Sequence, residues 1–156
     1  MTDAVDPAAG APDERAQAVA LFNGTWALLE RRDRTRADDD RMLHMAHASR
    51  YHWGQVGDAT NLVRGEWQCS RVYTVLGRAE PAVHHARRAL ELCQEAGIGD
   101  FDLAFCYEAM ARAHALSGDA SERDRWLSLG RQAADAVRDP QDRELVLADL
   151  ASVPTG

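Results

Sequence analysis

Glycine residues divide the middle of this sequence into segments that are each about the length of one helix. Gly57, Gly77, Gly97 and Gly118 interrupt stretches rich in residues that favour helices. Side chains that can cap a helix N-terminus follow or precede these breaks, and no segment has the pattern of a good strand. The expected N-terminal caps are Asp13, Thr35, Asp58, Asp100, Ser121 and Asp139. The helices predicted on this basis cover about 13–30, 35–56, 58–76, 79–96, 100–117, 121–137 and 139–150.

The expected fold class is therefore all-α, with about seven helices. The loops are short, so neighbouring helices are expected to run antiparallel as hairpins. A chain of 156 residues suits one domain, which we assign to residues 13–152. Residues 1–12 are rich in alanine, proline, glycine and aspartate, and we expect them to form a disordered tail.

The charge of the chain limits the partners that it can bind. The net charge is −7, and all 18 basic residues are arginine. An acidic chain without a basic stripe is not expected to bind nucleic acid or an anionic membrane. The N-terminus lacks a secretory signal and no stretch approaches 18 apolar residues, so the expected location is cytoplasmic.

Two stretches of the sequence match position by position at a constant offset. This offset equals the separation of Cys69 from Met110, and we call it the repeat spacing. Each stretch has an apolar–small pair, then a ring side chain, a turn glycine and a second helix. The matching positions are Cys69-Ser70, Tyr73, Gly77, Ala82 and Ala89-Leu90 in the first, and Met110-Ala111, His114, Gly118, Arg123 and Gly130 in the second. Small residues at such positions let helices pack closely.

This order resembles the tetratricopeptide repeat, over roughly residues 63–137. The segment VLGRAEPAVHHARRALEL (75–92) carries most of the resemblance. The repeat spacing is longer than the ~34 residues usual in that family, and Arg123 stands where alanine is expected. The resemblance implies antiparallel hairpins stacked as a short right-handed array. It also implies a non-catalytic module that binds a peptide or partner protein along a concave face.

Arginine and aromatic residues mark the expected concave groove. Arg64, Trp67 and Arg71 share one side of their helix, and Phe105, Glu108 and Arg112 share the matching side of the equivalent helix. Arginine beside aromatic rings suits recognition of an acidic peptide or carboxylate. The predicted partner-binding residues are Arg64, Trp67, Arg71, Glu108 and Arg112. The alternative for the arginines is a set of salt bridges with nearby carboxylates.

A second hypothesis is an enzyme, or a protein that binds a small molecule or a metal. It uses a polar pocket between helices 36–56, 58–76 and 79–96, with His47, His52, Glu66 and His85 as the working groups. Glu66 lies in an otherwise apolar stripe, where an unpaired carboxylate is costly. The segment HMAHASRYHW (44–53) projects His44 and His47 about 60° apart, but His52 about 140° from His47.

No recognised catalytic or metal-binding motif accompanies these residues. The chain has no H-E-x-x-H, no glycine-rich phosphate loop and no C-x-x-C. Its three cysteines are expected to act as small buried hydrophobic residues. A nucleophilic pair of Cys69 with His52 or His85 is the less favoured alternative. We therefore lean against catalysis and expect no cofactor and no metal. A homodimer is possible but has no specific signal.

Overall fold

The computed structural model describes residues 13–156, and these residues form helices joined by short loops. Residues 1–12, for which a disordered tail was predicted, lie outside the described residues. The described part of the chain contains no strand, which confirms the all-α prediction. The helices are α1 (Glu14–Glu30), α2 (Arg36–Val56), α3 (Ala59–Val75), α4 (Ala79–Glu95), α5 (Asp100–Ser117), α6 (Ala120–Asp135) and α7 (Pro140–Ala151).

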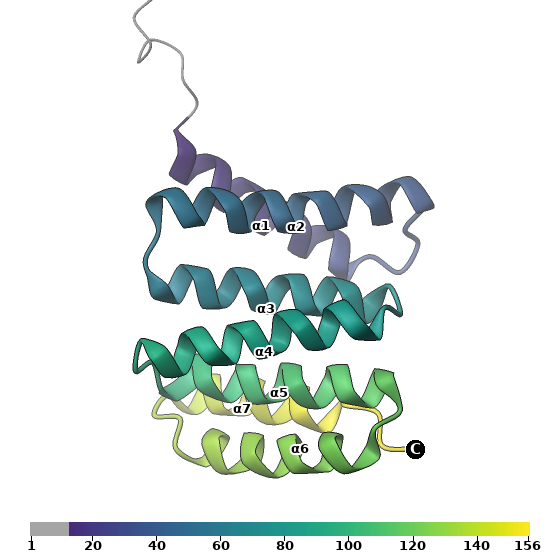
Figure 1. Cartoon of the computed structure of the whole chain (residues 1–156), viewed down its shortest axis with the longest axis vertical. Coiled ribbons are helices and arrows are strands. Elements are labelled where there is room, and N and C mark those ends of the chain that lie inside the picture. The colour runs from purple at the N-terminus through teal and green to yellow at the C-terminus, as the bar shows by residue number, and fades with distance from the viewer. Residues whose placement is uncertain (1–12) are drawn as a thin grey trace, which may run out of the picture.

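Successive helices pack as hairpins that stack along the long axis of the molecule (Figure 1). α1 packs on α2, α3 on α4 and α5 on α6, while α7 covers the end of the stack by contacting α5 and α6. The second and third hairpins follow one another at the predicted repeat spacing. α3 begins at Ala59 and α5 begins at Asp100, which are separated by this spacing. The same spacing separates Ala79, where α4 begins, from Ala120, where α6 begins.

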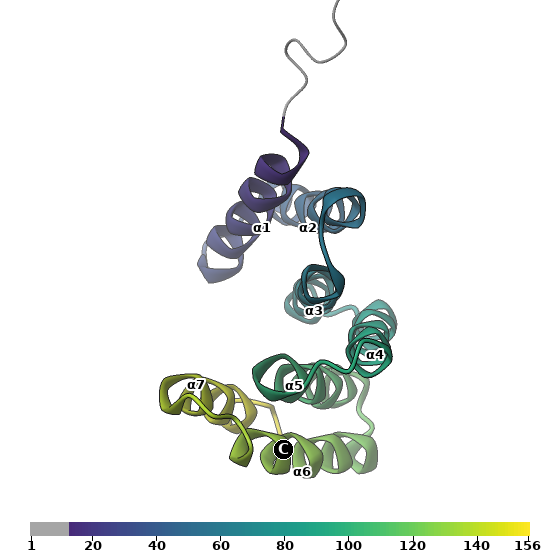
Figure 2. The ribbon, with the colours of Figure 1, turned by 90° about the vertical axis from the view of Figure 1, so that its left-hand side faces the viewer.

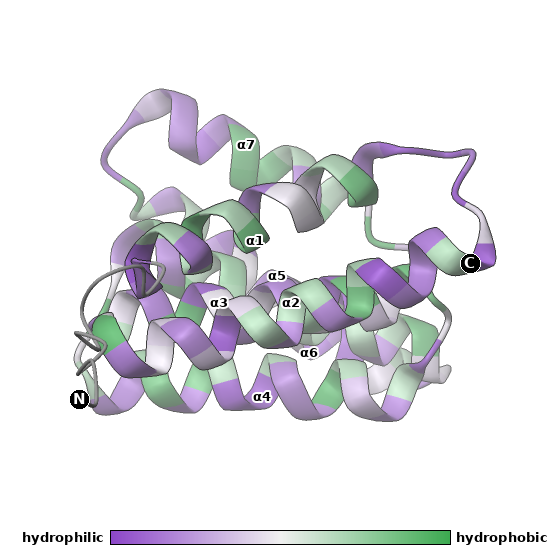
Figure 3. Ribbon diagram, turned by 90° about the horizontal axis from the view of Figure 1, so that it is seen from above, coloured by the Kyte–Doolittle hydropathy of each residue, from purple (hydrophilic) through white to green (hydrophobic). Residues whose placement is uncertain are grey.

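The helices fall into two sets. We call α1, α3, α5 and α7 the inner helices and α2, α4 and α6 the outer helices. α1 and α7 project to one side at the two ends of the stack, with α3 and α5 between them, whereas α2 and α4 lie on the other side (Figure 2). Viewed from above, α1 and α7 again lie on the side opposite α4 (Figure 3). Hydrophobic and hydrophilic residues alternate along α4 in the same view. No helix within residues 13–156 is long and apolar enough to cross a membrane.

Most of the expected helix caps are present. Asp13, Asp58 and Asp139 accept hydrogen bonds from the first turns of α1, α3 and α7, and Thr35 forms a capping box with Asp38 at the start of α2. Such caps satisfy backbone N–H groups that have no partner within the helix. The sequence pattern therefore located these four helix starts correctly.

Two cap assignments were wrong. Asp119, and not Ser121, caps α6, because its side chain accepts from the backbone N–H of Glu122. Asp119 directly follows the left-handed Gly118, so the chain has already turned when it reaches this residue. For α5 the cap position lies one residue earlier than predicted, at Gly99, and no side chain caps this helix. Asp100 is the first residue of α5 and has a φ of 54°.

Small side chains allow the inner and outer helices to approach closely. Ala82, Ala86, Ala89 and Cys93 form a fully buried stripe on α4, and they pack against residues of α3 and α5. A second apolar cluster joins α5, α6 and α7 around Leu150, which is almost fully buried. Both clusters include residues that also line a groove on the inner helices, among them Trp67.

Candidate functional site

A groove with a volume of about 520 Å³ runs along the inner helices. Each of the four inner helices contributes to it, in agreement with their common side in Figure 2. α1 and α7 form the two ends of the groove and α3 and α5 form its floor. The lining residues are Phe22, Trp26, Glu30, Val63, Arg64, Trp67, Arg71, Phe101, Asp102, Phe105, Cys106, Leu145 and Asp149.

Aromatic rings form a continuous row across the floor of the groove. The indole centroids of Trp26 and Trp67 are 5.3 Å apart, and the ring of Phe105 meets Trp67 edge-on at 5.7 Å. Phe101 extends the row, with its ring centroid 4.7 Å from that of Phe105. Edge-on and tilted contacts of this kind are the favoured arrangements of aromatic pairs. Trp67 remains only partly buried at the centre of the row.

Helical spacing explains how the sequence builds this row. Phe22 and Trp26 are four residues apart on α1, as are Phe101 and Phe105 on α5, so each pair lies on one side of its helix. On α3, Arg64, Trp67 and Arg71 follow the same rule and face the groove together. Three of the five predicted partner-binding residues therefore lie in one continuous groove.

The two groove arginines are already paired with carboxylates. Arg64 makes a bidentate contact with Asp102, with Nε donating to Oδ1 at 2.9 Å and Nη2 donating to Oδ2 at 3.3 Å. Arg71 donates from Nη2 to Asp149 at 3.1 Å and from Nη1 to Glu108 at 3.4 Å. The structure therefore has the salt-bridge arrangement that was the alternative for these arginines. Each guanidinium already has a carboxylate partner.

Glu108 and Arg112 lie behind the groove and do not line it. Arg112 Nε donates to Glu108 Oε1 at 2.6 Å, and Arg112 Nη2 donates to the backbone oxygen of Asp149 at 2.9 Å and to Ser152 Oγ at 2.7 Å. The crevice that these side chains border has no room for a water molecule. This network holds α7 against α5, so the structure gives Glu108 and Arg112 a structural place instead of the predicted binding one.

Several groove residues were not identified from the sequence. The sequence pattern assigned neither Phe22 nor Trp26 to a site. Phe101, Leu145 and Asp149 were not singled out at all. A signal for Trp26 does exist, because the repeat spacing that separates the matching hairpins also separates Trp26 from Trp67. For Leu145 and Asp149 the sequence offers no comparable signal, since α7 lies outside the repeat.

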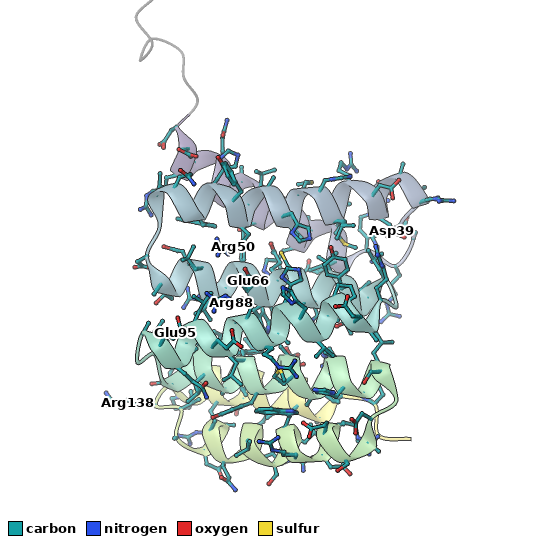
Figure 4. All side chains as sticks on the ribbon, viewed as in Figure 1. Asp39, Arg50, Glu66, Arg88, Glu95 and Arg138 are labelled. Carbon is teal, nitrogen blue, oxygen red and sulfur yellow. The ribbon has the colours of Figure 1, made fainter. Side chains whose placement is uncertain are left out.

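The predicted polar pocket exists in part, on the outer side of α3. Glu66 receives hydrogen bonds from Arg50 Nε of α2 at 3.0 Å and from His85 Nδ1 of α4 at 2.6 Å. Figure 4 shows Arg50 extending from α2 toward Glu66. Burial opposes ionisation of Glu66, but the hydrogen bonds and charges of His85 and Arg50 outweigh this effect and lower its pKa. The carboxylate is therefore ionised and links three helices.

His47 contacts the same group of side chains through Tyr73. We call Arg50, His47, Glu66, Tyr73 and His85 the polar cluster. The Nε2 of His47 lies 2.8 Å from the hydroxyl oxygen of Tyr73, and its Nδ1 lies 3.9 Å from Sγ of Cys69. The ring of His85 stacks on Tyr73 and also lies 5.3 Å from the ring of His47, measured between centroids. Burial, together with the charge of His85, lowers the pKa of His47, so its ring is neutral at pH 7.

His52 does not belong to this cluster, contrary to the predicted pocket. Its Nδ1 lies 3.2 Å from Glu14 Oε1 of α1, on another side of α2 from His47. The physical reason is the angle of about 140° between the two positions on one helix. The structure therefore brings together His47, Glu66 and His85, and separates His52 from them.

The cluster does not have the features of a nucleophilic or metal centre. Cys69 is fully buried, and burial raises its pKa to about 12, which leaves it as an un-ionised thiol. Across residues 13–156, no three or more His, Cys, Asp or Glu side chains are placed to hold a metal ion. Both ring nitrogens of His47 and one of His85 face neighbours within the protein. The side chains of the cluster instead form a hydrogen-bonded connection between α2, α3 and α4.

Comparisons of the chain with protein-family models, curated proteins and solved structures found no match.

Proposed function

We propose that this protein is a non-catalytic, tetratricopeptide-like interaction module that binds a segment of a partner protein along its groove. The observation that carries the proposal is the row of aromatic rings left partly open to solvent between α1 and α7. Trp67 lies at its centre, and Leu145, at its edge on α7, has 53% of its surface exposed. Contiguous apolar surface of this kind is characteristic of binding sites, and buried tryptophans often contribute most of the binding energy.

The arrangement of the helices supports the proposal. The second and third hairpins follow the repeat spacing, and small side chains on α4 allow neighbouring hairpins to pack closely. Stacked hairpins present their inner helices side by side, which suits an extended or helical segment that crosses several of them. The resemblance to tetratricopeptide repeats implies this same mode of binding.

The roles of the groove residues differ from those first expected. Because Arg64 and Arg71 are paired with Asp102 and Asp149, the arginines hold the inner helices together. The aromatic rings, and above all Trp67, supply the contact surface for the partner. An apolar anchor side chain of the partner would displace water from these rings, which is favourable in proportion to the area covered.

Selection from a library of random linear peptides tests the proposal. The wild-type protein is immobilised, the retained peptides are synthesised, and their affinities are measured by fluorescence anisotropy. Trp67→Ala is expected to weaken binding by about thirty-fold, the effect of losing a central aromatic contact of about 2 kcal/mol. Circular dichroism first establishes that this variant is folded.

Two matched pairs of variants make the result specific. Leu145→Ala and Leu147→Ala change the same residue type on α7, but only Leu145 lines the groove. Trp126 lies on α6, outside the groove, and serves as the control for Trp67. Peptides that bind Leu147→Ala and Trp126→Ala normally, but bind Leu145→Ala and Trp67→Ala weakly, would support the groove. Failure to select any peptide, or equal binding by all four variants, would refute the proposal.

A further inference from the structure

We infer that the partner segment is basic, with an apolar or aromatic anchor for the groove and arginine or lysine beside that anchor. This inference rests on the proposed function and adds the chemistry of the partner. It comes from the distribution of charge between the two sets of helices and from the pairing of the charged groups that line the groove.

Among the helices, most of the net negative charge lies on the inner set. α1, α3, α5 and α7 contain nine carboxylates and five arginines, a net charge of −4. The outer helices contain nine carboxylates and eight arginines, a net charge of −1. Glu66 belongs to α3 but faces the outer helices, and without it the inner set still carries −3. The field that an approaching partner meets at the groove is therefore negative.

The groove arginines offer no free positive charge of their own. Arg64 and Arg71 are neutralised by Asp102 and Asp149, so neither offers a free cation to an acidic ligand. Glu30 also lines the groove, is exposed, and makes no ion pair with any residue of 13–156. It lies at the C-terminal end of α1, next to the Trp26 end of the aromatic row. A cationic side chain of the partner can pair with Glu30 without breaking an existing contact.

The opposite end of the aromatic row, at Phe101, is acidic as well, because Asp102 follows Phe101 and also lines the groove. The Arg64 guanidinium is held by Asp102 and also lies within the field of Asp58 and Asp142, and together these carboxylates raise the pKa of Arg64. Of these three carboxylates, Asp102 contacts Arg64 directly, and the charge around this arginine is negative on balance. A segment with an apolar centre and basic residues on both sides fits an aromatic floor that has negative charge at each end.

Charge also argues against a second copy of this chain as the occupant. The chain carries a net charge of −7, so a second copy would bring like charge to an acidic face. The mass of the purified protein under native conditions tests this directly. A dimer that dissociates in Trp67→Ala would assign the groove to a second copy and overturn the inference. A small molecule retained by the wild-type protein and lost from Trp67→Ala would overturn it too.

The selected peptides provide the main test. Those that need Trp67 are expected to have a positive net charge next to an aromatic or aliphatic residue. Each is synthesised with its lysine and arginine residues, and again with glutamate in their place. The basic form is expected to bind at least about ten-fold more tightly than the acidic form, and to weaken as salt is raised, because screening reduces its attraction to the groove.

A matched pair of variants locates the charge effect. Glu30→Gln is expected to weaken the basic peptides by about two- to five-fold at low salt, as is usual for a charge at the edge of an interface. Glu80→Gln makes the same change in charge on the outer helix α4 and should leave binding unchanged. Equal effects of the two variants would overturn the inference.

The failure of this inference is distinguishable from the failure of the proposed function. If the peptides that need Trp67 are acidic or uncharged, the groove still binds a partner segment, but the basic chemistry is wrong. If no selected peptide needs Trp67, the groove itself is not the binding site and both proposals fall.

Discussion

Arg112 Nε donates a hydrogen bond of 2.6 Å to Oε1 of Glu108, a carboxylate of which only 1% is exposed. The same oxygen accepts a longer bond from Arg71 at 3.4 Å. Arg112 also reaches the last turn of α7, so one side chain joins the buried carboxylate to the helix that ends the stack. The stability of the groove therefore depends on residues that lie behind it.

Removing Arg112 should destabilise the fold much more than removing an exposed groove arginine. Arg112→Ala leaves Glu108 buried with one weak partner, and we expect a loss of about 2–4 kcal/mol in the free energy of unfolding. Arg64→Ala removes a half-exposed ion pair and should cost less than about 1 kcal/mol. Urea denaturation measures both values. Equal losses would show that the Glu108 network does not stabilise the fold.

A methyl group at Gly130 should destabilise the contact between α6 and α7. A Cβ placed there would lie 2.8 Å from Cδ2 of Leu150, which is buried in the core, so Gly130→Ala forces the helices apart. Overpacking of this kind costs about 1–3 kcal/mol. Gly54→Ala on α2 places a Cβ 3.2 Å from Nη1 of Arg50, which is not the nitrogen that binds Glu66, and should stabilise that helix by about 0.5–1 kcal/mol. Thermal unfolding should therefore shift in opposite directions, and a higher midpoint for Gly130→Ala would contradict this packing.

Acid should destabilise the protein in part through His47. The pKa of His47 is lowered below its ordinary value of 6.5, so the unfolded chain binds a proton more readily than the folded one. Its contribution to stability is present above pH 6.5 and is lost as pH falls through the folded pKa. Glu66 contributes in the same direction at lower pH. Its pKa is lowered below the ordinary value of 4.5, so its contribution to stability is lost only as pH falls below that value.

The His47 effect can be isolated by substitution. His47→Gln should flatten the dependence of the unfolding midpoint on pH below 6.5, the ordinary value of the His47 pKa. His84→Gln makes the same change at an exposed position of α4 and should keep the wild-type dependence. A wild-type slope in His47→Gln would show that another group causes the loss.

The three cysteine thiols should be unreactive in the folded protein. Cys69, Cys93 and Cys106 are all fully buried, and the pKa of Cys69 is raised to about 12. A thiol reagent such as 5,5′-dithiobis(2-nitrobenzoate) should give no signal with native protein and should titrate all three groups in denaturant. Fast labelling of Cys69 in the native state would instead support the cysteine–histidine pairing that the structure disfavours.

The helices were predictable because their signals are local. Asp13, Thr35, Asp58 and Asp139 act through bonds to residues two or three positions away, so the sequence alone places them. The error at α6 has the same origin, since Asp119 and Ser121 are both cap-forming residues two positions apart. The repeat spacing likewise predicted how the second and third hairpins follow one another.

The sites were harder to predict because they depend on how each helix is rotated about its axis. The side of α3 that carries Trp67 and the side of α5 that carries Glu108 were both expected to face the groove. In the structure Trp67 lies on the floor of the groove, whereas Glu108 lies behind it. His52 meets Glu14 of α1, a contact between residues 38 apart that no local pattern records. Asp149 pairs with Arg71 across an even longer separation, through a helix outside the repeat.

The tryptophan side chains offer the most direct test of the groove as the binding site. The chain has four, and each gives a separate indole signal in a proton–nitrogen correlation spectrum. Trp26 and Trp67 line the groove, whereas Trp126 on α6 donates its indole N–H to Glu122 away from it. Titration with a selected peptide should shift the signals of Trp26 and Trp67 and leave that of Trp126 in place. A shift of Trp126 with Trp26 and Trp67 unchanged would place the partner elsewhere and contradict the account.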